Sequence, residues 1–422
     1  MRGVGGIKEM VPGAGHGNVS KRPIWVLHRF RVLAPMRRQM PGVRFLEPAK
    51  KERVLWVTPS KRLGVSGNRE GKEPMKAMQI TAFGGPEHLH LADIPTPEPG
   101  AGEVRIRVTR CGVNPVDRSQ VLGRWTWLQL PHIPGSEILG VVDKVGPGVS
   151  TVDVGQRVGV ALRLFCNQCH YCLRGQEQLC MADPRTTVSP AIPGAFTEGG
   201  YAEYTIVPAL NAIPVPAGVD DDSACAATLD GVTAWHMIER ARISAGDRVL
   251  VVGASGGLGT LFLQLVRQRG AVPVAVTGNM AHLAAFHDLG AETVIDRTAG
   301  NVVDEVRRLT GGRGMDAVLD PTGAASWTAS IGALARGGRY VTCGILTGAE
   351  VTLNLAPFYA QEQEVIGSTG GSRRDLVDCF DAIARGTFKF PIHARYPLSG
   401  AADAMRALSD PSRLGKVLLE IG

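Results

Sequence analysis

A glycine-rich turn between an apolar run and a helical pattern most restricts the folds open to this chain. The run Arg248–Val252 is typical of a short buried strand, and apolar residues recur at helical spacing over Leu258–Arg269. Four further strand-like runs follow, with helical patterns between them: Val272–Thr277, Thr293–Asp296, Asp316–Leu319 and Tyr340–Cys343. This alternation predicts an α/β fold with a doubly wound parallel sheet, covered by helices on both faces.

The turn itself predicts a dinucleotide site. It reads Gly-Ala-Ser-Gly-Gly-Leu-Gly, and the key positions of the G-x-G-x-x-G pattern are held by Ala254, Gly256 and Gly259. Gly256 permits close approach of a pyrophosphate, and Gly259 permits close packing of helix on strand. The helix opens at Gly257 and Leu258, where free N–H groups face the phosphates. Although alanine replaces the first glycine, the flanking strand and helix support the site.

The end of the second strand bears on which dinucleotide binds. Sites that prefer NAD place Asp or Glu there to bind the ribose hydroxyls. Here Thr277 and Asn279 end the run, with no carboxylate to repel a 2′-phosphate and no Arg or Lys immediately after it. The sequence therefore favours NADP(H) over NAD(H). Cys343 and Gly344, at the end of the fifth strand, complete the predicted cofactor site.

Four cysteines within 15 residues form the sharpest group of candidate metal ligands: Cys166, Cys169, Cys172 and Cys180. Four thiolates at this spacing can close a tetrahedral shell around zinc, which leaves no position for water or substrate. We therefore expect one structural zinc ion. Free thiols or two disulfides are the alternatives, and a cytosolic chain favours a metal over either.

The charge distribution separates the first 74 residues from the remainder. Residues 1–74 hold 16 Lys and Arg against 5 Asp and Glu, whereas residues 75–422 hold 30 against 34. We expect the basic segment to be a disordered tail or an extension that is not made, rather than a targeting peptide. The acidic remainder argues against a nucleic-acid partner, and no apolar run is long enough to span a membrane. We expect a cytoplasmic protein.

Several motifs resemble those of the zinc-containing medium-chain dehydrogenase/reductase superfamily. They include Cys111–Asp117, Pro134–Glu137, Val154–Val158, Gly199–Tyr204 and Gly415–Val417. The resemblance implies a GroES-like β-rich catalytic domain over 75–229 and 369–422, and a Rossmann cofactor domain over 230–368.

The same resemblance assigns further residues and an assembly. It implies that Thr233 lies near the nicotinamide and Lys416 near the pyrophosphate. It also implies a homodimer formed through the edge of the Rossmann sheet, near Glu350–Leu355.

The resemblance also indicates that a catalytic metal is missing. Alcohol dehydrogenases of this superfamily hold a catalytic zinc, and the three ligand positions here are Asn114, Ser136 and Leu229 or Asp230. Val116 stands at the position of the usual proton-relay hydroxyl. Alcohol–carbonyl interconversion needs an electrophile on the oxygen, so this substitution pattern argues against it.

The Asn-Pro-Val-Asp motif instead resembles the quinone oxidoreductase and enone reductase branch. There a hydride passes from NADPH to a quinone or an activated double bond, and hydrogen-bond donors hold the developing charge. Asn114 and Asp117 are our catalytic candidates, with the Asn114 carboxamide as one donor; a turn role before Pro115 is the alternative. The tyrosine common after this motif is replaced by Arg118 and Ser119.

Two other functions remain open at this point. The first is an alcohol dehydrogenase or carbonyl reductase with an atypical zinc site, which two zinc ions per subunit would indicate. The second is a nucleotide-binding redox sensor or structural protein, which tight NADPH binding without turnover would indicate. In the leading interpretation the substrate is a small carbonyl compound, an enone or a quinone, and Trp125 and Trp127 are candidates to line its pocket.

Overall fold

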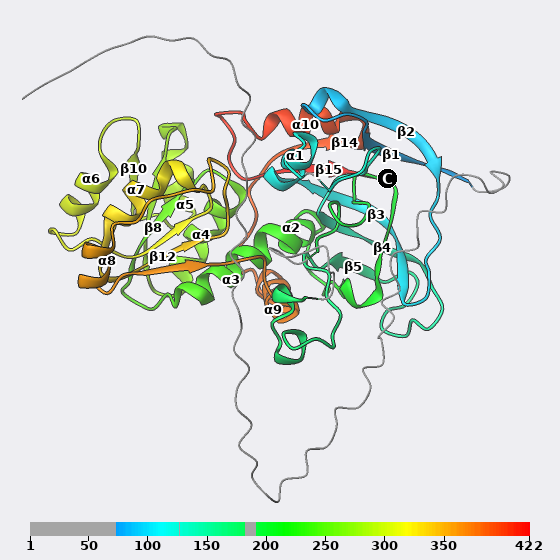
Figure 1. The fold of residues 1–422 in the computed structure, drawn as a ribbon, viewed down its shortest axis with the longest axis horizontal. Coiled ribbons are helices and arrows are strands. Elements are labelled where there is room, and N and C mark those ends of the chain that lie inside the picture. The colour runs from blue at the N-terminus through cyan, green and yellow to red at the C-terminus, as the bar shows by residue number, and fades with distance from the viewer. Residues whose placement is uncertain (1–72, 126, 182–190) are drawn as a thin grey trace, which may run out of the picture. The chain divides into compact units, whose positions relative to one another are not determined.

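The computed structural model describes residues 73–125, 127–181 and 191–422 (Figure 1). The basic segment singled out above therefore lies almost wholly outside the described residues. Within them the first strand, β1, spans Pro74–Ile80. Among the described residues, no helix combines the length and apolarity that crossing a bilayer requires.

A six-stranded parallel sheet occupies the region of alternating strands and helices, in the order β10–β9–β8–β11–β12–β13. Its strands are β8 (Arg248–Val252), β9 (Val272–Thr277), β10 (Thr293–Asp296), β11 (Met315–Asp320), β12 (Leu334–Thr342) and β13 (Glu364–Gly367). The helices between them are α4 (Gly257–Gln268), α5 (Leu283–Asp288), α6 (Val302–Leu309), α7 (Ala324–Ala333) and α8 (Leu355–Ala360).

Successive residues of β8 enter two different hydrophobic cores, as expected for a sheet covered on both faces. Val249 and Val251 pack with α3 (Val232–Ala241), α4 and α9 (Arg373–Ala384). Leu250 and Val252 pack with α6 and α7. The predicted doubly wound sheet is therefore confirmed, because each face of the central strand buries its own set of side chains.

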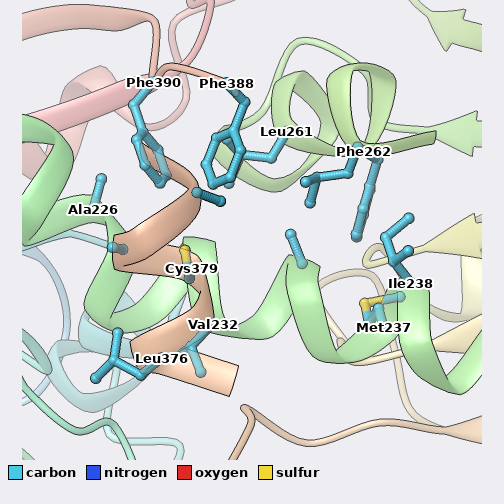
Figure 2. Packing of buried hydrophobic residues seen from close by; sticks show 14 of the residues in the cluster. Ala226, Val232, Met237, Ile238, Leu261, Phe262, Leu376, Cys379, Phe388 and Phe390 are labelled. Atoms are coloured by element: carbon cyan, nitrogen blue, oxygen red, sulfur yellow. The ribbon is translucent and has the colours of Figure 1, made fainter. Parts of the chain in front are cut away.

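The first of these cores joins helices that lie far apart in the sequence. Figure 2 shows Met237 of α3 and Phe262 of α4 in this core, with Leu376 and Cys379 of α9 and the ring of Phe390. Because Phe262 and Cys379 are fully buried, this packing fixes α3 and α4 against α9.

The β-rich unit is a seven-stranded sheet with the order β14–β15–β3–β4–β5–β7, in which β6 also pairs with β3. The strands are β3 (Glu103–Val113), β4 (Glu137–Val145), β5 (Arg157–Val160), β6 (Tyr204–Pro208), β7 (Ala212–Pro214), β14 (Ile392–Pro397) and β15 (Lys416–Glu420). A separate antiparallel pair joins β1 to β2 (Leu89–Pro95). Since β15 pairs antiparallel with β3, the last strand of the chain lies beside an early one.

A helical segment connects the two sheets. It consists of α2 (Asp221–Ala226), a π-helical turn over Ala227–Gly231, and α3. A π-turn inserts an extra residue into the helical repeat and is common at functional sites. Here it carries Asp230, whose side chain is buried.

The turn after β8 yields a stability prediction. A Cβ added at Gly259 would lie 2.2 Å from the Gly253 carbonyl oxygen and 2.6 Å from the Ala254 Cα. Gly259→Ala must therefore push α4 off β8, and we expect the free energy of unfolding to fall by about 2 kcal/mol. Thermal melting followed by circular dichroism measures this. Gly300→Ala is the matched control, because a Cβ there meets nothing within 4 Å. Equal melting temperatures for the two variants would contradict the prediction.

Candidate functional site

The glycine turn between β8 and α4 offers free backbone N–H groups to an anion. Gly256 is the N-cap residue of α4, and no side chain caps the helix. The first N–H groups of a helix have no partner within it, so they bind phosphate well. A Cβ at Gly256 would come no nearer than 3.4 Å to protein atoms, so its backbone is open to a ligand. This cradle suits the pyrophosphate of a dinucleotide.

An arginine that the sequence analysis did not select lies beside this turn. Arg413 Nη2 is 3.8 Å from the position of a Cβ at Gly256, and Arg413 Nη1 donates to the Gly415 carbonyl at 2.9 Å. Gly415 in turn forms a parallel bridge with Gly256, and its N–H donates to the Ser255 carbonyl at 2.9 Å. The backbone before Lys416 thus lies next to the turn, but the guanidinium of Arg413 is the cation placed there.

A second missed arginine lies at the end of β9. Thr277 pairs with Asp296 in the parallel register of β9 and β10, so Arg297 is brought opposite Gly278. Its Nη2 is 2.6 Å from the position of a Cβ at Gly278. The strand pairing was the available signal, because residues that follow adjacent parallel strands lie side by side. Asn279, which the sequence predicts as a cofactor-binding residue, makes a hydrogen bond within its own turn: its side-chain oxygen accepts from the Ala281 N–H at 2.9 Å.

The remaining predicted cofactor residues lie on α3 and at the ends of the inner strands. Thr233 is buried in the first turn of α3, and Thr277 Oγ1 accepts from the Asn279 N–H at 3.0 Å. Gly344 follows β12, and a Cβ there would lie 2.0 Å from the Pro321 carbonyl oxygen. Burial raises the pKa of the neighbouring Cys343 to about 12, and Asp230 adds to the shift, so this thiol is protonated at neutral pH.

A buried lysine binds the acidic and amide groups of the catalytic motifs. Lys416 Nζ lies 2.7 Å from Asn114 Oδ1, 2.7 Å from Glu137 Oε2 and 2.9 Å from Asp230 Oδ2. All four residues are buried, with Lys416 3% and Glu137 0% exposed. An ammonium group carries three hydrogens and accepts nothing, so these three oxygens saturate it.

This arrangement fixes the orientation of the Asn114 amide. Because Oδ1 faces a donor-only ammonium, Nδ2 lies on the other side, where it donates to Glu137 Oε2 at 3.0 Å. The Asn114 backbone N–H donates to Asp117 Oδ2 at 2.9 Å, so both ends of this residue are held. Among the described residues, only Glu137 accepts from Nδ2, so its second hydrogen is available to another acceptor.

Asp117 holds the two motif loops together. Its Oδ1 accepts from the Ser136 N–H at 3.1 Å and from Ser136 Oγ at 3.2 Å, while Oδ2 accepts from Asn114. Burial raises the pKa of Asp117 to about 7, although these hydrogen bonds oppose the shift. Asp117 therefore positions Asn114 by accepting from its backbone N–H and holds it against the Ser136 loop.

A catalytic zinc does not fit this donor set. Ser136 Oγ is directed to Asp117, and Asn114 Oδ1 and Asp230 Oδ2 are both taken by the Lys416 ammonium. Within the described part of the chain, the only group of three or more His, Cys, Asp or Glu side chains close enough to share a metal is the four-cysteine cluster. Where the three oxygens converge, the protein therefore places the ammonium of Lys416.

The four cysteines fit a structural zinc. Their sulfur atoms all lie within 4.8 Å of one another, and neighbouring pairs are 3.5–3.9 Å apart: Cys166–Cys172, Cys169–Cys172, Cys169–Cys180 and Cys180–Cys166. A tetrahedron with Zn–S bonds of about 2.3 Å has sulfur–sulfur edges of roughly 3.8 Å. The zinc would tie this loop together without reaching the Lys416 cluster.

Two histidines and the candidate Trp127 have packing or pairing roles in the structure. His132 Nε2 lies 2.7 Å from the Gly194 carbonyl oxygen, and His236 Nδ1 lies 3.0 Å from Asp375 Oδ2. Trp127 is half exposed and stacks on Phe196, with ring centroids 5.5 Å apart. Trp127 lies on the loop that follows α1 (Pro115–Val121) and, with Phe196 from a later segment, forms a partly exposed aromatic surface.

Comparison with known proteins adds relatives of two kinds. The sequence profile described as "Alcohol dehydrogenase GroES-like domain" matches residues 100–217, and that described as "Zinc-binding dehydrogenase" matches residues 257–385. The chain is 31% identical to an NAD-dependent alcohol dehydrogenase of Sulfurisphaera tokodaii, over 82% of this chain and 99% of the relative. It is 30% identical to a quinone oxidoreductase of Rattus norvegicus, over 83% and 98%.

A solved structure resembles this one over the same region. It is a thermostable alcohol dehydrogenase from Pyrobaculum aerophilum, 41% identical, with a TM-score of 0.75 over 82% of this chain and 100% of that chain. This match supports the predicted pairing of a GroES-like domain with a parallel-sheet domain.

The sulfur cluster yields a prediction about metal content. We expect one zinc ion per subunit in protein purified without added metal, and we expect Cys169→Ser to lose it, because three thiolates bind zinc less tightly than four. Elemental analysis by mass spectrometry measures the ratio. Cys379→Ala, which removes a buried thiol outside the cluster, should retain the ion. Full zinc occupancy in Cys169→Ser would show that the cluster is not the site.

Proposed function

Because the chain belongs to the zinc-containing medium-chain dehydrogenase/reductase superfamily, we propose that this nicotinamide-dependent oxidoreductase reduces a quinone or an α,β-unsaturated carbonyl compound with NADPH, without a catalytic metal. One observation carries the proposal. The oxygens of Asn114 and Asp230 that converge in the site bind the ammonium of Lys416 instead of presenting an open metal position.

A conjugated substrate suits a site of this kind. When bound, NADPH supplies the hydride, and the conjugated system spreads the resulting negative charge onto the carbonyl oxygen. Hydrogen-bond donors can then stabilise that oxygen without a Lewis acid. The second Nδ2 hydrogen of Asn114 is the candidate donor, since Lys416 and Glu137 hold the amide in one orientation. An unconjugated ketone needs stronger polarisation than one amide hydrogen provides.

The aromatic surface near α1 supports a planar substrate. Trp125 and Trp127 have ring centroids 5.4 Å apart, and Trp127 stacks on Phe196. An exposed aromatic face binds another flat ring by offset stacking, which is worth about 1 kcal/mol beyond the area buried. We assign this surface to the ring of a quinone or an aryl enone.

The cofactor assignment rests on the two arginines that the fold brings to the site. Arg413 lies beside the glycine turn and suits a pyrophosphate, and Arg297 lies beside Gly278, where an adenosine 2′-phosphate would project. We therefore assign NADPH as the preferred cofactor, with NADH as the weaker one.

We also propose a homodimer formed through the edge of the parallel sheet. β13 is the last strand of that sheet, and apolar side chains on and near it are exposed: Val351, Leu355, Tyr359 and Val365. An open strand edge with exposed apolar side chains is a typical site of subunit pairing. None of the eight cysteines forms a disulfide, which suits the reducing cytoplasm that we propose.

Replacement of Arg297 tests the cofactor assignment. A charge-assisted hydrogen bond to phosphate is worth about 1.5–3 kcal/mol, so we expect Arg297→Ala to raise the KM for NADPH by roughly tenfold or more. The KM for NADH should stay unchanged, because NADH lacks the 2′-phosphate. Arg308→Ala, on the exposed face of α6, is the matched control and should alter neither value. A proportional rise for both cofactors in Arg297→Ala would refute a 2′-phosphate role.

Turnover of defined substrates tests the reaction itself. We expect NADPH oxidation with a benzoquinone and a simple enone, little with a saturated ketone, and no loss of activity after treatment with a mild chelator. Asn114→Ala should lower kcat/KM by about 100-fold, the typical effect of losing one donor to a developing oxyanion.

Other outcomes would point to the alternatives. Alcohol oxidation that is lost when a second, labile zinc ion is removed would support the alcohol dehydrogenase alternative. Tight NADPH binding with no turnover of any of these compounds would support a sensor or structural role. Unchanged kcat/KM in Asn114→Ala would remove Asn114 from the mechanism.

A further inference from the structure

We propose that Lys416 is the resident cation of the buried cluster and excludes divalent metal ions from it, so that removing its amine converts Asn114, Glu137 and Asp230 into a metal site. The proposal concerns what the cluster binds and does not depend on which carbonyl compound is reduced. Its evidence is the convergence of three oxygens on one nitrogen.

The three oxygens come from three separate segments. Asn114 follows β3, Glu137 begins β4, and Asp230 lies in the π-helical turn. Each is 2.7–2.9 Å from Lys416 Nζ, which is hydrogen-bond contact with an ammonium. Metal–oxygen bonds of about 2.0–2.2 Å would require the oxygens to move inward by roughly 0.6 Å. Such a shift lies within the reach of side-chain rotation.

The surrounding backbone leaves room for these side chains. A Cβ at Gly257 would lie 1.9 Å from Asp230 Oδ2 and 2.8 Å from Lys416 Cδ, and a Cβ at Gly112 would lie 1.5 Å from Glu137 Oε2. Two glycines therefore make space for the carboxylates and the lysine stem. The cluster is built into the packing, unlike a chance meeting of flexible surface charges.

The charges explain why a cation is required here. Burial lowers the pKa of Lys416, but Asp230 and Glu137 outweigh this effect and hold it above its usual range, so the amine is charged. Burial raises the pKa of Glu137 to about 7 even with Lys416 beside it. Without the ammonium, two carboxylates would share a buried site with no positive partner.

A divalent ion would satisfy that deficit. Its charge matches two carboxylates, and carboxylate and amide oxygens are ligands that Mn²⁺, Co²⁺ and Zn²⁺ accept. Lys416→Ala removes the charge and the four-carbon stem together, which opens space for the ion and a water molecule. In the native chain, the Lys416 side chain occupies this space and its ammonium binds the same three oxygens.

Metal titration of the native chain and K416A provides the test. After dialysis against excess Co²⁺, we expect the native chain to hold one metal ion per subunit, at the four cysteines, and K416A to hold two. The second Co²⁺ should give visible d–d absorption without the thiolate charge-transfer band, because its donors are oxygens. Lys389→Ala, which removes an exposed lysine, is the control and should hold one ion. The double variant D230N/K416A should return to one.

Two results would overturn the proposal. One is a folded K416A that holds only one metal ion per subunit. The other is a native chain that takes up a second oxygen-bound ion, since Lys416 would then exclude nothing. If K416A does not fold without added metal, folding in the presence of Co²⁺ decides: a folded variant with a second ion supports the proposal, and a single ion or failure to fold overturns it. Metal content and turnover are separate readouts, so either proposal can fail alone.

Discussion

The salt bridge of Lys416 with Glu137 and Asp230 is the interaction on which the functional site depends. All three side chains are buried, so removing one of them would leave an uncompensated charge in the interior. The Lys416 ammonium also fixes the orientation of the Asn114 amide, which we propose as a hydrogen-bond donor to the substrate. Strand β4, the π-helical turn and the late strand β15 supply Glu137, Asp230 and Lys416 in turn.

The fold could be predicted well wherever a segment carries its own pattern. β8 and β9 occupy the ranges that their apolar runs indicate, because an inner strand of a parallel sheet is buried on both faces. The edge strand β10 also occupies its predicted range. The four-cysteine cluster was also visible in the sequence, since short loops bring its thiolates together without help from the rest of the chain. β12 begins at Leu334, whereas the sequence predicts a strand from Tyr340. The first half of the strand was missed because two glycines interrupt its apolar run.

The site could be predicted only in part, because its important contacts join distant segments. Arg297 reaches the end of β9 through strand pairing, and Arg413 reaches the glycine turn through the bridge between Gly415 and Gly256. The resemblance placed Lys416 near the pyrophosphate, and its backbone does lie by that turn. No local pattern could show that its amine turns toward Asn114 and the carboxylates, since that choice depends on the register of β15 against β3.

That register has a consequence for how the protein is made. Lys416 and Asn114 are 302 residues apart in the sequence, and β15 closes the sheet edge beside β3. On the ribosome, the segments that carry Glu137 and Asp230 emerge long before the ammonium that neutralises them. Any folding intermediate formed during synthesis must therefore keep these two carboxylates hydrated or protonated. The native arrangement of the Lys416 cluster is thus among the last features of the molecule to form.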